Sequence, residues 1–379
     1  MINEMIKLGD VASYINGYAF KPEDRGNVGL PIIRIQDLTG NAYDLGFYNG
    51  EYPSKIEINN GDVLISWSAS LGIYVWNRGK ALLNQHIFKV AFDKSNIDKN
   101  YFVYAVRQKL EEMKKKAHGA TMKHIVKKDF DATMIPYPSV LEQTKIANNL
   151  DKISKIIEHR KKELQLLDNL IKARFVEMFG DPVLNEKGWV TRPFLDMGSC
   201  KNGMNFHYED SGVELNCLGV GDFKDYSVIT NTELLPTVSL NEMPSEEYLL
   251  RDDDIVFVRS NGNKALVGRS VAVYSGDTPT TFSGFCIRYR KHDDDITIPY
   301  LLRALKTDSI RMKMAGRGAN IQNLNQQILG TLIIPVPPLD LQNQFAEFIK
   351  QVDKSKVAVQ KALDETQVLF DSLMQKYFG

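Results

Sequence analysis

The chain has 379 residues, of which 43% are hydrophobic, and its 47 Lys and Arg side chains are balanced by 47 Asp and Glu. This length predicts two or three domains with real hydrophobic cores, which excludes wholesale disorder. The zero net charge argues against a histone-like or tail-driven nucleic-acid binder, although a basic face opposed by acidic loops gives the same sum.

The N-terminus and the cysteines indicate the compartment. The first residues, MINEMIKLGDVASY, contain no basic segment before an apolar core, and no run of 18 apolar residues occurs anywhere in the sequence. We therefore expect no membrane contact and a cytoplasmic location. The three cysteines form no C-x-x-C pair, which argues against a disulfide framework and against a zinc site.

The first part of the chain is rich in predicted strands. Short β-type runs at 31–38, 62–67 and 86–92 are separated by turns rich in Gly, Asn and Asp. Polar loops on a rigid β scaffold are common recognition sites, although a turn former without a ligand explains any single residue equally well. The candidate contact residues here are Arg34, Ser66, Trp67, Ser70, Asn84, Gln85 and His86.

A basic stretch follows at 107–128, with eight Lys and Arg against two Glu. Such concentrated charge suits phosphate contacts, which supply affinity without reading sequence. A solvated helix end would explain the same charges. The candidate contact residues in this stretch are Lys114, Lys115, Lys116, Thr121 and Lys123.

After the Pro-x-Pro at 136–138 the pattern becomes that of one long helix. Apolar residues alternate at spacings of three and four, as in a coiled-coil heptad. A helix of about 35 residues extends on the order of 50 Å, so its apolar seam needs a partner, unless it belongs to an ordinary helical bundle. The predicted seam is Ile146, Leu150, Ile153, Ile157, Leu164, Leu167 and Ile171, with Arg160 and Arg174 as polar interruptions.

The chain then repeats itself. The segment beginning at His118 matches the segment 199 residues later without a gap, and the match continues to Phe179-Gly180 against Phe378-Gly379. Earlier parts correspond with smaller offsets. Chance similarity is the alternative, but 63 ungapped residues that share a Pro-x-Pro argue against it. We predict a tandem repeat of one unit of roughly 190 residues.

The second copy keeps the scaffold and changes the side chains. It has β-type runs at 254–260, 267–275 and 285–290, and Asn and Gln replace the lysines of the basic stretch. These amides can pair with adenine edges and Arg with guanine, so the pattern suits a binder of two different targets. The candidate contact residues are Ser260, Asn261, Asn263, Lys264, Arg269, Arg317, Asn320, Gln322 and Asn323.

The second copy also ends in a heptad helix that starts after its own Pro-x-Pro. The first copy is the nearest partner for this helix, and Lys356 and Thr366 interrupt its seam in the way that fixes register. The second seam is Phe345, Ile349, Val352, Val359, Leu363, Phe370 and Leu373.

The sequence offers little catalytic chemistry. It has no G-x-x-x-x-G-K-[ST] phosphate loop, and its six histidines show no metal-ligand spacing. The acidic triplets Asp252–Asp254 and Asp293–Asp295 could be imagined as metal sites, but both precede β-type runs and are more simply solvated turns. We expect a chain that is not an enzyme by itself and holds no metal.

Taken in order, these motifs resemble a known family. Two copies of a β-rich segment, G-A-[TN], I-P-x-P and a heptad helix, together with GDVLIS at 61–66 and LNQHIFKV at 83–90, look like the specificity subunits of type I restriction–modification systems. The resemblance covers essentially the whole chain. In one respect the copies differ, because Glu142-Gln143 becomes Leu341-Gln342, which weakens any claim that the two helices begin with identical caps or contacts.

The resemblance implies a fold and a division of labour. The fold class is α+β, with two β-rich α/β target recognition domains separated by two long antiparallel coiled-coil helices, in a pseudo-two-fold tandem repeat. Each recognition domain would bind one half of a split target in double-stranded DNA, and the helices would set the unread spacer. The implied recognition domains are residues 1–140 and 181–340, and the implied helices are residues 141–180 and 341–379.

The resemblance also implies partners. Two modification subunits would methylate adenine N6 with S-adenosylmethionine, and restriction subunits would translocate and cleave DNA with ATP and magnesium, so this chain itself needs no cofactor. Two alternatives from other classes stay open at this point. One is a duplicated coiled-coil adaptor that binds protein or glycan, and the other is a hydrolase built around the acidic triplets.

Overall fold

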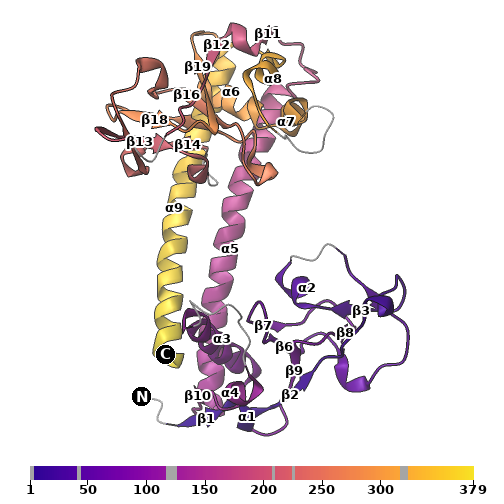
Figure 1. Ribbon diagram of the computed structural model, residues 1–379. Helices are drawn as coiled ribbons and strands as arrows, with labels where there is room; N and C mark the ends of the chain where they lie inside the picture. Colours follow the sequence, from indigo (N-terminus) through magenta and orange to yellow (C-terminus); the bar gives the residue numbers. More distant parts are fainter. Residues whose placement is uncertain (1–3, 41–43, 117–125, 207–209, 224–226, 316–322) are drawn as a thin grey trace. The chain divides into compact units, whose positions relative to one another are not determined.

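The computed structural model describes residues 4–40, 44–116, 126–206, 210–223, 227–315 and 323–379 (Figure 1). The contacts divide the chain into two compact units, Met1–Lys162 with Gln360–Gly379, and Glu163–Val359. Two helices of 40 residues each, α5 (Val140–Phe179) and α9 (Leu339–Phe378), begin in one unit and end in the other. Each unit therefore contains the start of one long helix and the end of the other.

The first unit has two four-stranded sheets with a core between them. One sheet is entirely antiparallel, and in the other β3 and β8 are parallel. Ile33, Leu64 and Trp76 are buried between the two sheets. In spatial order the strands are β2 (Ser13–Asn16), β9 (Ile87–Ala91), β6 (Val63–Ser66) and β7 (Gly72–Val75), and β4 (Phe47–Tyr48), β3 (Leu30–Ile33), β8 (Ala81–Leu83) and β5 (Glu57–Ile58).

Helices and a small sheet complete this unit. Tyr101 and Phe102 on α3 are fully buried with Phe130 on α4, against the antiparallel sheet and the ends of the long helices. These elements are α1 (Leu8–Val11), α3 (Lys99–Lys116), α4 (Lys127–Asp131), and strand β1 (Met5–Lys7) paired with β10 (Met134–Pro136).

One predicted strand differs from the structure. The run at 31–38 reads as a single strand in the sequence, but the chain passes from β3 into helix α2 (Ile35–Thr39). The carboxylate of Asp37 accepts a hydrogen bond from the backbone amide of Arg34 at 2.9 Å, which caps the start of this helix. A local polar cap thus overrides the β-type composition of the run.

The second unit repeats this plan with a larger sheet. Its core includes Phe257, Tyr289 and Leu301, which are all fully buried. In spatial order the strands are β12 (Gly198–Asn202), β19 (Cys286–Lys291), β16 (Asp254–Val258), β17 (Ser270–Val273) and β14 (Val228–Ile229), then β15 (Thr237–Leu240), β13 (Val213–Leu218) and β18 (Thr280–Phe282), and β11 (Thr191–Pro193) with β20 (Ile333–Pro335). The helices are α6 (Ile298–Leu305), α7 (Asp308–Ala315) and α8 (Gln326–Gly330).

The internal repeat is visible in individual hydrogen bonds. The hydroxyl of Tyr101 donates to the carbonyl of Pro136 at 2.9 Å, and Tyr300, 199 residues later, donates to Pro335 at 2.8 Å. Buried Gln143 and Gln342 behave alike. Gln143 accepts from the amide of Asp98 and donates to Pro138, whereas Gln342 accepts from Thr297 and donates to Pro337. The change from Glu142 to Leu341 thus leaves the contacts of the neighbouring glutamines the same in both copies.

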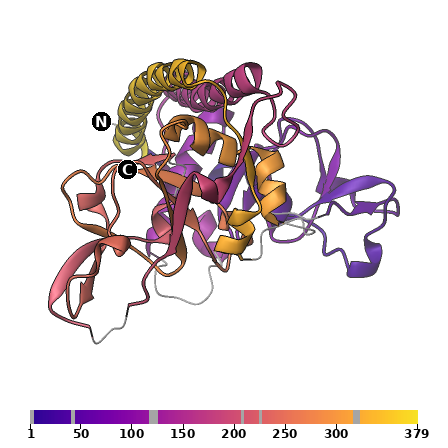
Figure 2. The same ribbon diagram turned by 90° about the horizontal axis from the view of Figure 1, so that it is seen from above.

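Within each unit the start of one long helix packs against the end of the other, which makes the pairing antiparallel (Figures 1 and 2). None of the predicted seam residues is exposed. Ile146, Leu150, Ile157, Phe345, Val352 and Leu363 are buried, and Ile153, Leu164, Leu167, Ile171, Ile349, Val359, Phe370 and Leu373 are half-buried.

The polar interruptions of the seam make contacts across the helix pair. Arg160 donates to the carbonyl of Ala362 and, at 2.7 Å, to the hydroxyl of Thr366. The ammonium of Lys356 lies 2.7 Å from the carboxylate of Asp168. These contacts tie each helix to one position along its partner, as expected for polar residues in a coiled-coil seam. The mixed helix and strand class predicted from the sequence is confirmed.

Candidate nucleic-acid interface

In the first unit, the turn between β8 and β9 crosses the end of β2. The amide of Tyr18 donates to Leu83 at 2.9 Å, and the amide of Gln85 donates back to Tyr18 at 2.9 Å. The approach is so close that a Cβ on Gly17 would lie 2.0 Å from the carbonyl oxygen of Asn84. Only glycine fits at such a position. We call residues 84–86 the first crossing turn.

The crossing turn lies beside the turn that follows β6. The amide of Trp67 donates to the carbonyl of His86 at 3.3 Å, and their rings meet edge to face with centroids 5.0 Å apart. The structure thus brings together Trp67, Ser70, Asn84, Gln85 and His86, which the sequence placed in two separate loops. Gln85 and Ser70 are exposed, whereas Asn84, Trp67 and His86 are half-buried.

His86 has an unusual conformation within this group. Its φ is +71°, in the left-handed region that is costly for a residue with a Cβ atom. Its Nδ1 is buried and has no hydrogen-bond partner among the described residues. Backbone strain together with an unsatisfied polar atom is typical of a functional position, because neither contributes to folding stability.

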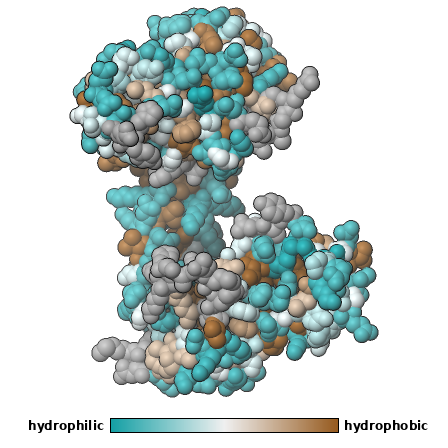
Figure 3. Space-filling model, in the orientation of Figure 1, coloured by the Kyte–Doolittle hydropathy of each residue, from teal (hydrophilic) through white to brown (hydrophobic). Residues whose placement is uncertain are grey.

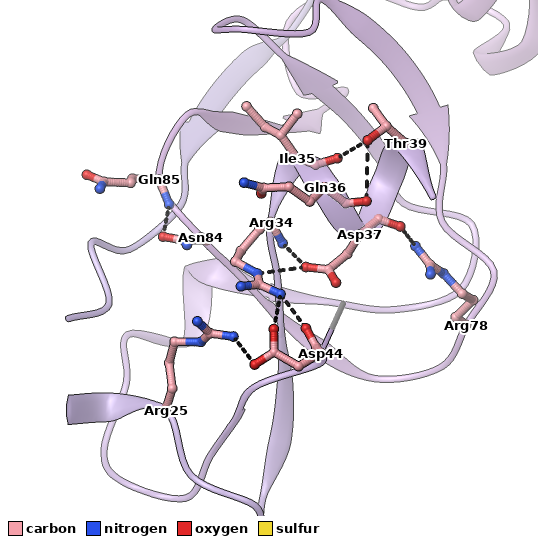
Figure 4. A network of polar contacts seen from close by, with 10 residues as sticks. All are labelled: Arg25, Arg34, Ile35, Gln36, Asp37, Thr39, Asp44, Arg78, Asn84 and Gln85. Atoms are coloured by element: carbon pink, nitrogen blue, oxygen red, sulfur yellow. Dashed lines mark hydrogen bonds and ion pairs between the residues drawn. The ribbon is translucent and has the colours of Figure 1, made fainter. Parts of the chain in front are cut away.

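Two candidates in the first unit have structural roles instead. Ser66 is completely buried, and its hydroxyl donates to the carbonyl of Ser70, so its side chain cannot reach a ligand. Arg34 donates to the carboxylate of Asp37 at 3.1 Å and also contacts Asp44 (Figure 4). The hydrogen bond that Arg34 donates to Asp37, with the charges of both carboxylates, raises the pKa of Arg34 although burial opposes this. Burial thus occupies Ser66 and ion pairs occupy Arg34, so neither side chain is carried into the interface proposed below.

The second unit repeats the crossing. The amide of Met204 donates to Phe282 at 3.1 Å, and the amide of Gly284 donates back to Met204 at 2.6 Å. A Cβ on Gly203 would lie 2.1 Å from the carbonyl oxygen of Ser283. We call residues 283–285 the second crossing turn. Its backbone is bonded as in the first turn, but its side chains are entirely different.

Phe285 occupies the position of His86, 199 residues later. Its side chain is 60% exposed, which is unusual for an aromatic residue on a turn. Arg259 lies beside it, because the amide of Arg259 donates to the carbonyl of Phe285 at 2.7 Å, as Trp67 does to His86. Phe285 and Arg259 were not among the candidates from the sequence, although the repeat offset alone would have found Phe285.

The polar loop after β16 lies next to the second crossing turn. The amide of Ser260 contacts the carbonyl of Phe285 at 3.4 Å, and the amide of Leu324 donates to Arg259 at 2.8 Å, which brings exposed Asn323 to the same place. Asn261 and Asn263 use their carbonyl oxygens to accept backbone amides within the loop. Lys264 is exposed, and Arg269, at the end of the loop, is half-buried.

The remaining candidates cannot all be placed. Thr121, Lys123, Arg317, Asn320 and Gln322 lie outside the described residues, and Lys115 and Lys116 are described only as part of helix α3. Lys114 forms an ion pair with Glu111 at 2.6 Å. Part of the positive charge predicted at 107–128 is thus neutralised within the same helix.

The acidic triplets do not form a metal site in the described part of the chain. Asp254 is fully buried and forms an ion pair with Arg290 at 2.8 Å, and Asp293 pairs with Arg192. No group of three or more His, Cys, Asp or Glu that could hold a metal ion occurs among the described residues. Of the helices described, none is long and apolar enough to cross a membrane.

The two crossing turns fall inside two stretches that match one protein family. A model of the type I restriction modification DNA specificity domain matches residues 3–168 and 220–366. The chain belongs to this family. The family predicted from the sequence is confirmed, and a specificity role in a type I restriction system is favoured over the adaptor and the hydrolase.

Similar specificity subunits come from bacteria and archaea. The type I restriction enzyme StySPI specificity subunit of Salmonella potsdam is 25% identical over 406 residues, covering 97% of this chain and 86% of the relative. The MjaVIII specificity subunit of Methanocaldococcus jannaschii is 22% identical, covering 95% and 89%. The EcoBI specificity subunit of Escherichia coli is 28% identical over 170 residues, which are 44% of this chain but 35% of the relative.

Solved structures share the specificity-subunit fold. The type I S subunit from M. genitalium is 17% identical, covers 99% of this chain and 96% of its own, and superimposes with a TM-score of 0.55. A chain from a study of assembly and conformational transition of the type I restriction–modification system is 16% identical and covers 99% and 97%, with a TM-score of 0.59. At these identities the similarity is one of fold.

Proposed function

We propose that this chain binds a bipartite target in double-stranded DNA and carries no catalytic site of its own. Residues 1–140 would recognise one half of the target and residues 181–340 the other. The observation that carries this proposal is the pair of crossing turns, in which the same backbone crossing presents Asn84, Gln85 and His86 in one unit and Ser283, Gly284 and Phe285 in the other. A duplicated scaffold with different side chains suits two different half-sites.

The two turns suit different base chemistry. Gln85 carries an exposed amide, which can bond both N6 and N7 of adenine in the major groove. Phe285 carries an exposed aromatic ring, which suits the methyl group of thymine and offers no hydrogen bond. Arg259, next to Phe285, is the candidate for a guanine edge. The two halves of the target should therefore differ in sequence.

The helix pair α5 and α9 would act as the spacer. Arg160 and Lys356 hold the helices at one register, which a spacer of defined length requires. Removal of one heptad from α5 and the equivalent heptad, 199 residues later, from α9 should shorten the unread spacer and keep both half-sites. An unchanged spacer would contradict this role.

The outer faces of the helices would bind two modification subunits. Apolar side chains that do not face the seam are exposed there, and Figure 3 shows hydrophobic side chains among hydrophilic ones along the helices. Those most exposed are Leu141, Val357, Val368, Leu166 and Val176, at 84%, 70%, 69%, 56% and 55%. In this proposal adenine N6 methylation with S-adenosylmethionine belongs to the modification subunits, and ATP- and magnesium-dependent cleavage to restriction subunits.

Single-molecule mapping of methylated adenines in cells that express this chain with its modification partner tests the proposal. We expect one bipartite motif, with two specified halves of different sequence and a constant gap. Purified complexes should bind duplex DNA with an affinity that falls as salt rises. An adaptor for protein or glycan would give neither the motif nor the salt dependence.

A further inference from the structure

A group of cations lies in the second unit, where helices α6 and α7 meet. Arg303 lies on α6, and Lys306 directly follows the last residue of this helix, one turn after Arg303. Helix α6 contacts β17 and α7, and Arg311 lies on α7. All three side chains are half-buried. We call these three residues the α6–α7 cations. Arg269, directly before β17, and Lys356, on α9, lie close enough to add to their positive potential.

The carboxylates around these cations do not balance their charge. The carboxylate of Asp168 lies 2.7 Å from the ammonium of Lys356, and the carboxylate of Asp353 lies 3.9 Å from it. Both carboxylates therefore also neutralise Lys356, a fourth cation outside the group. Asp308, on α7, is exposed. In the described part of the chain, these are the carboxylates that act on the α6–α7 cations or on Lys356.

Neutral atoms hold the α6–α7 cations in place. The ammonium of Lys306 donates to the hydroxyl of Ser227 at 2.9 Å, and Arg311 donates to the carbonyl of Val267 at 3.3 Å. The Nε of Arg303 is buried and has no hydrogen-bond partner among the described residues. The donors are therefore positioned, but among the described residues of this unit no anion neutralises them fully.

Such an arrangement costs free energy in the isolated chain. Burial and the neighbouring Arg303, Lys356 and Arg269 lower the pKa of Lys306 to about 8, against the charge of Asp168. Burial also lowers the pKa of Arg303 and of Arg311. An anion that entered the group would offset this repulsion, and two guanidinium groups with one ammonium match the oxygens of a phosphate.

We propose that Arg303, Lys306 and Arg311 form a binding site for a backbone phosphate of duplex DNA. This inference rests on the proposed function and adds to it a contact that fixes position without reading sequence. The group continues the candidate interface. Arg311 donates a hydrogen bond to the carbonyl of Val267 and lies near Arg269, and Val267 and Arg269 lie at the end of the polar loop beside the second crossing turn. That continuity favours DNA over an acidic protein surface.

The site belongs to the second repeat alone. The residues 199 positions earlier are Tyr104, Arg107 and Glu112, and the hydroxyl of Tyr104 donates to Asp151 at 2.7 Å. In the first repeat, Glu112 thus stands at the position of Arg311, and Tyr104 stands at the position of Arg303. The equivalent positions of the first repeat thus do not carry this triad of cations, so the two halves of the chain would hold the DNA backbone differently.

The test measures the affinity of the full chain, in complex with its modification subunits, for one duplex DNA over a range of salt concentrations. Lys306→Gln should lower the slope of log affinity against log salt by about one, the change expected for one lost phosphate contact. Lys306→Arg should keep the wild-type slope. Lys313→Gln, an exposed lysine on α7 outside the group, is the matched control and should also keep it. The methylated motif should be the same in all variants, because phosphate contacts carry no sequence information.

A second measurement guards against misfolding. Without DNA, Lys306→Gln should unfold at a higher temperature than the wild type, because one repelling charge is gone, and inorganic phosphate should raise the unfolding temperature of the wild type more than that of the variant. A well-folded Lys306→Gln variant with the wild-type salt slope would overturn the inference. A variant that no longer binds its modification subunits but shows no other change would also overturn it. If the wild-type complex itself shows no salt-dependent affinity for duplex DNA, the proposed function would be overturned instead.

Discussion

Phe378, at the end of α9, packs against Tyr101 of the first repeat with ring centroids 5.1 Å apart. The equivalent residue of α5, Phe179, packs against Tyr300 of the second repeat at 4.8 Å. All four rings are buried. Each unit is thus completed by the end of the helix that belongs to the other repeat, and neither repeat forms a full core without that helix end.

Phe378→Ala should destabilise the first unit. The deletion of a fully buried ring leaves a cavity that typically costs about 3–5 kcal/mol in the free energy of unfolding. Chemical denaturation of the full chain measures this cost. Leu369→Ala, on the same helix but 51% exposed, should change the free energy of unfolding by less than about 1 kcal/mol. Equal effects of the two substitutions would contradict this account of the helix end.

Gln143→Leu and Gln342→Leu should be similarly destabilising. Each substitution leaves a backbone amide and a backbone carbonyl, both at least partly buried, without their partners, at a typical cost of about 1–3 kcal/mol. Glu142→Leu, which creates the Leu-Gln pair of the second copy, is the control. Since Glu142 is exposed, this variant should stay within about 0.5 kcal/mol of the wild type in thermal denaturation.

Arg160 and Thr366 should be energetically coupled. The guanidinium of Arg160 donates to the Thr366 hydroxyl across the helix pair, so a double-mutant cycle of Arg160→Met and Thr366→Val should give an interaction energy of about 0.5–3 kcal/mol. The cycle of Arg174→Met with Thr366→Val should be additive, because Arg174 pairs with Glu177 on its own helix. Additivity in the first cycle would show that the contact does not set the register.

The free energy of unfolding should depend on pH through the titration of Lys306. Since its pKa in the folded chain is about 8, below the ordinary value of 10.5, the unfolded chain binds the proton more tightly between these pH values. The penalty is fully present below pH 8 and is relieved as pH rises toward 10.5. The excess unfolding temperature of Lys306→Gln over the wild type should therefore shrink as pH rises through this window. A difference that does not depend on pH would contradict the repulsion among the α6–α7 cations.

Much of the architecture could be predicted because it depends on local periodicity and on the repeat. The heptad spacing predicted two long helices, and the structure has α5 and α9 at the positions that the offset of 199 requires. The roles of Ser66 and Arg34 could not be predicted. Burial of Ser66 depends on the packing of two sheets, and the partners of Arg34 include Asp44, which comes ten residues later.

Residues that come from distant parts of the chain were also missed. The choice of polar side chains as candidates passed over Phe285, whose exposure becomes evident only in the folded turn. The α6–α7 cations approach Arg269 and Lys356 through tertiary packing, and no spacing in the sequence reports such a group. Local patterns thus identified the scaffold better than the surface it presents.

The most direct test of the central claim replaces residues 1–140 with the corresponding segment of another family member and maps methylated adenines by single-molecule sequencing. If each unit recognises its own half-site, one half of the motif should change, while the other half and the gap stay as they were. The reciprocal replacement of residues 181–340 should change the opposite half. A change in both halves after either replacement would contradict the account of two independent recognition units.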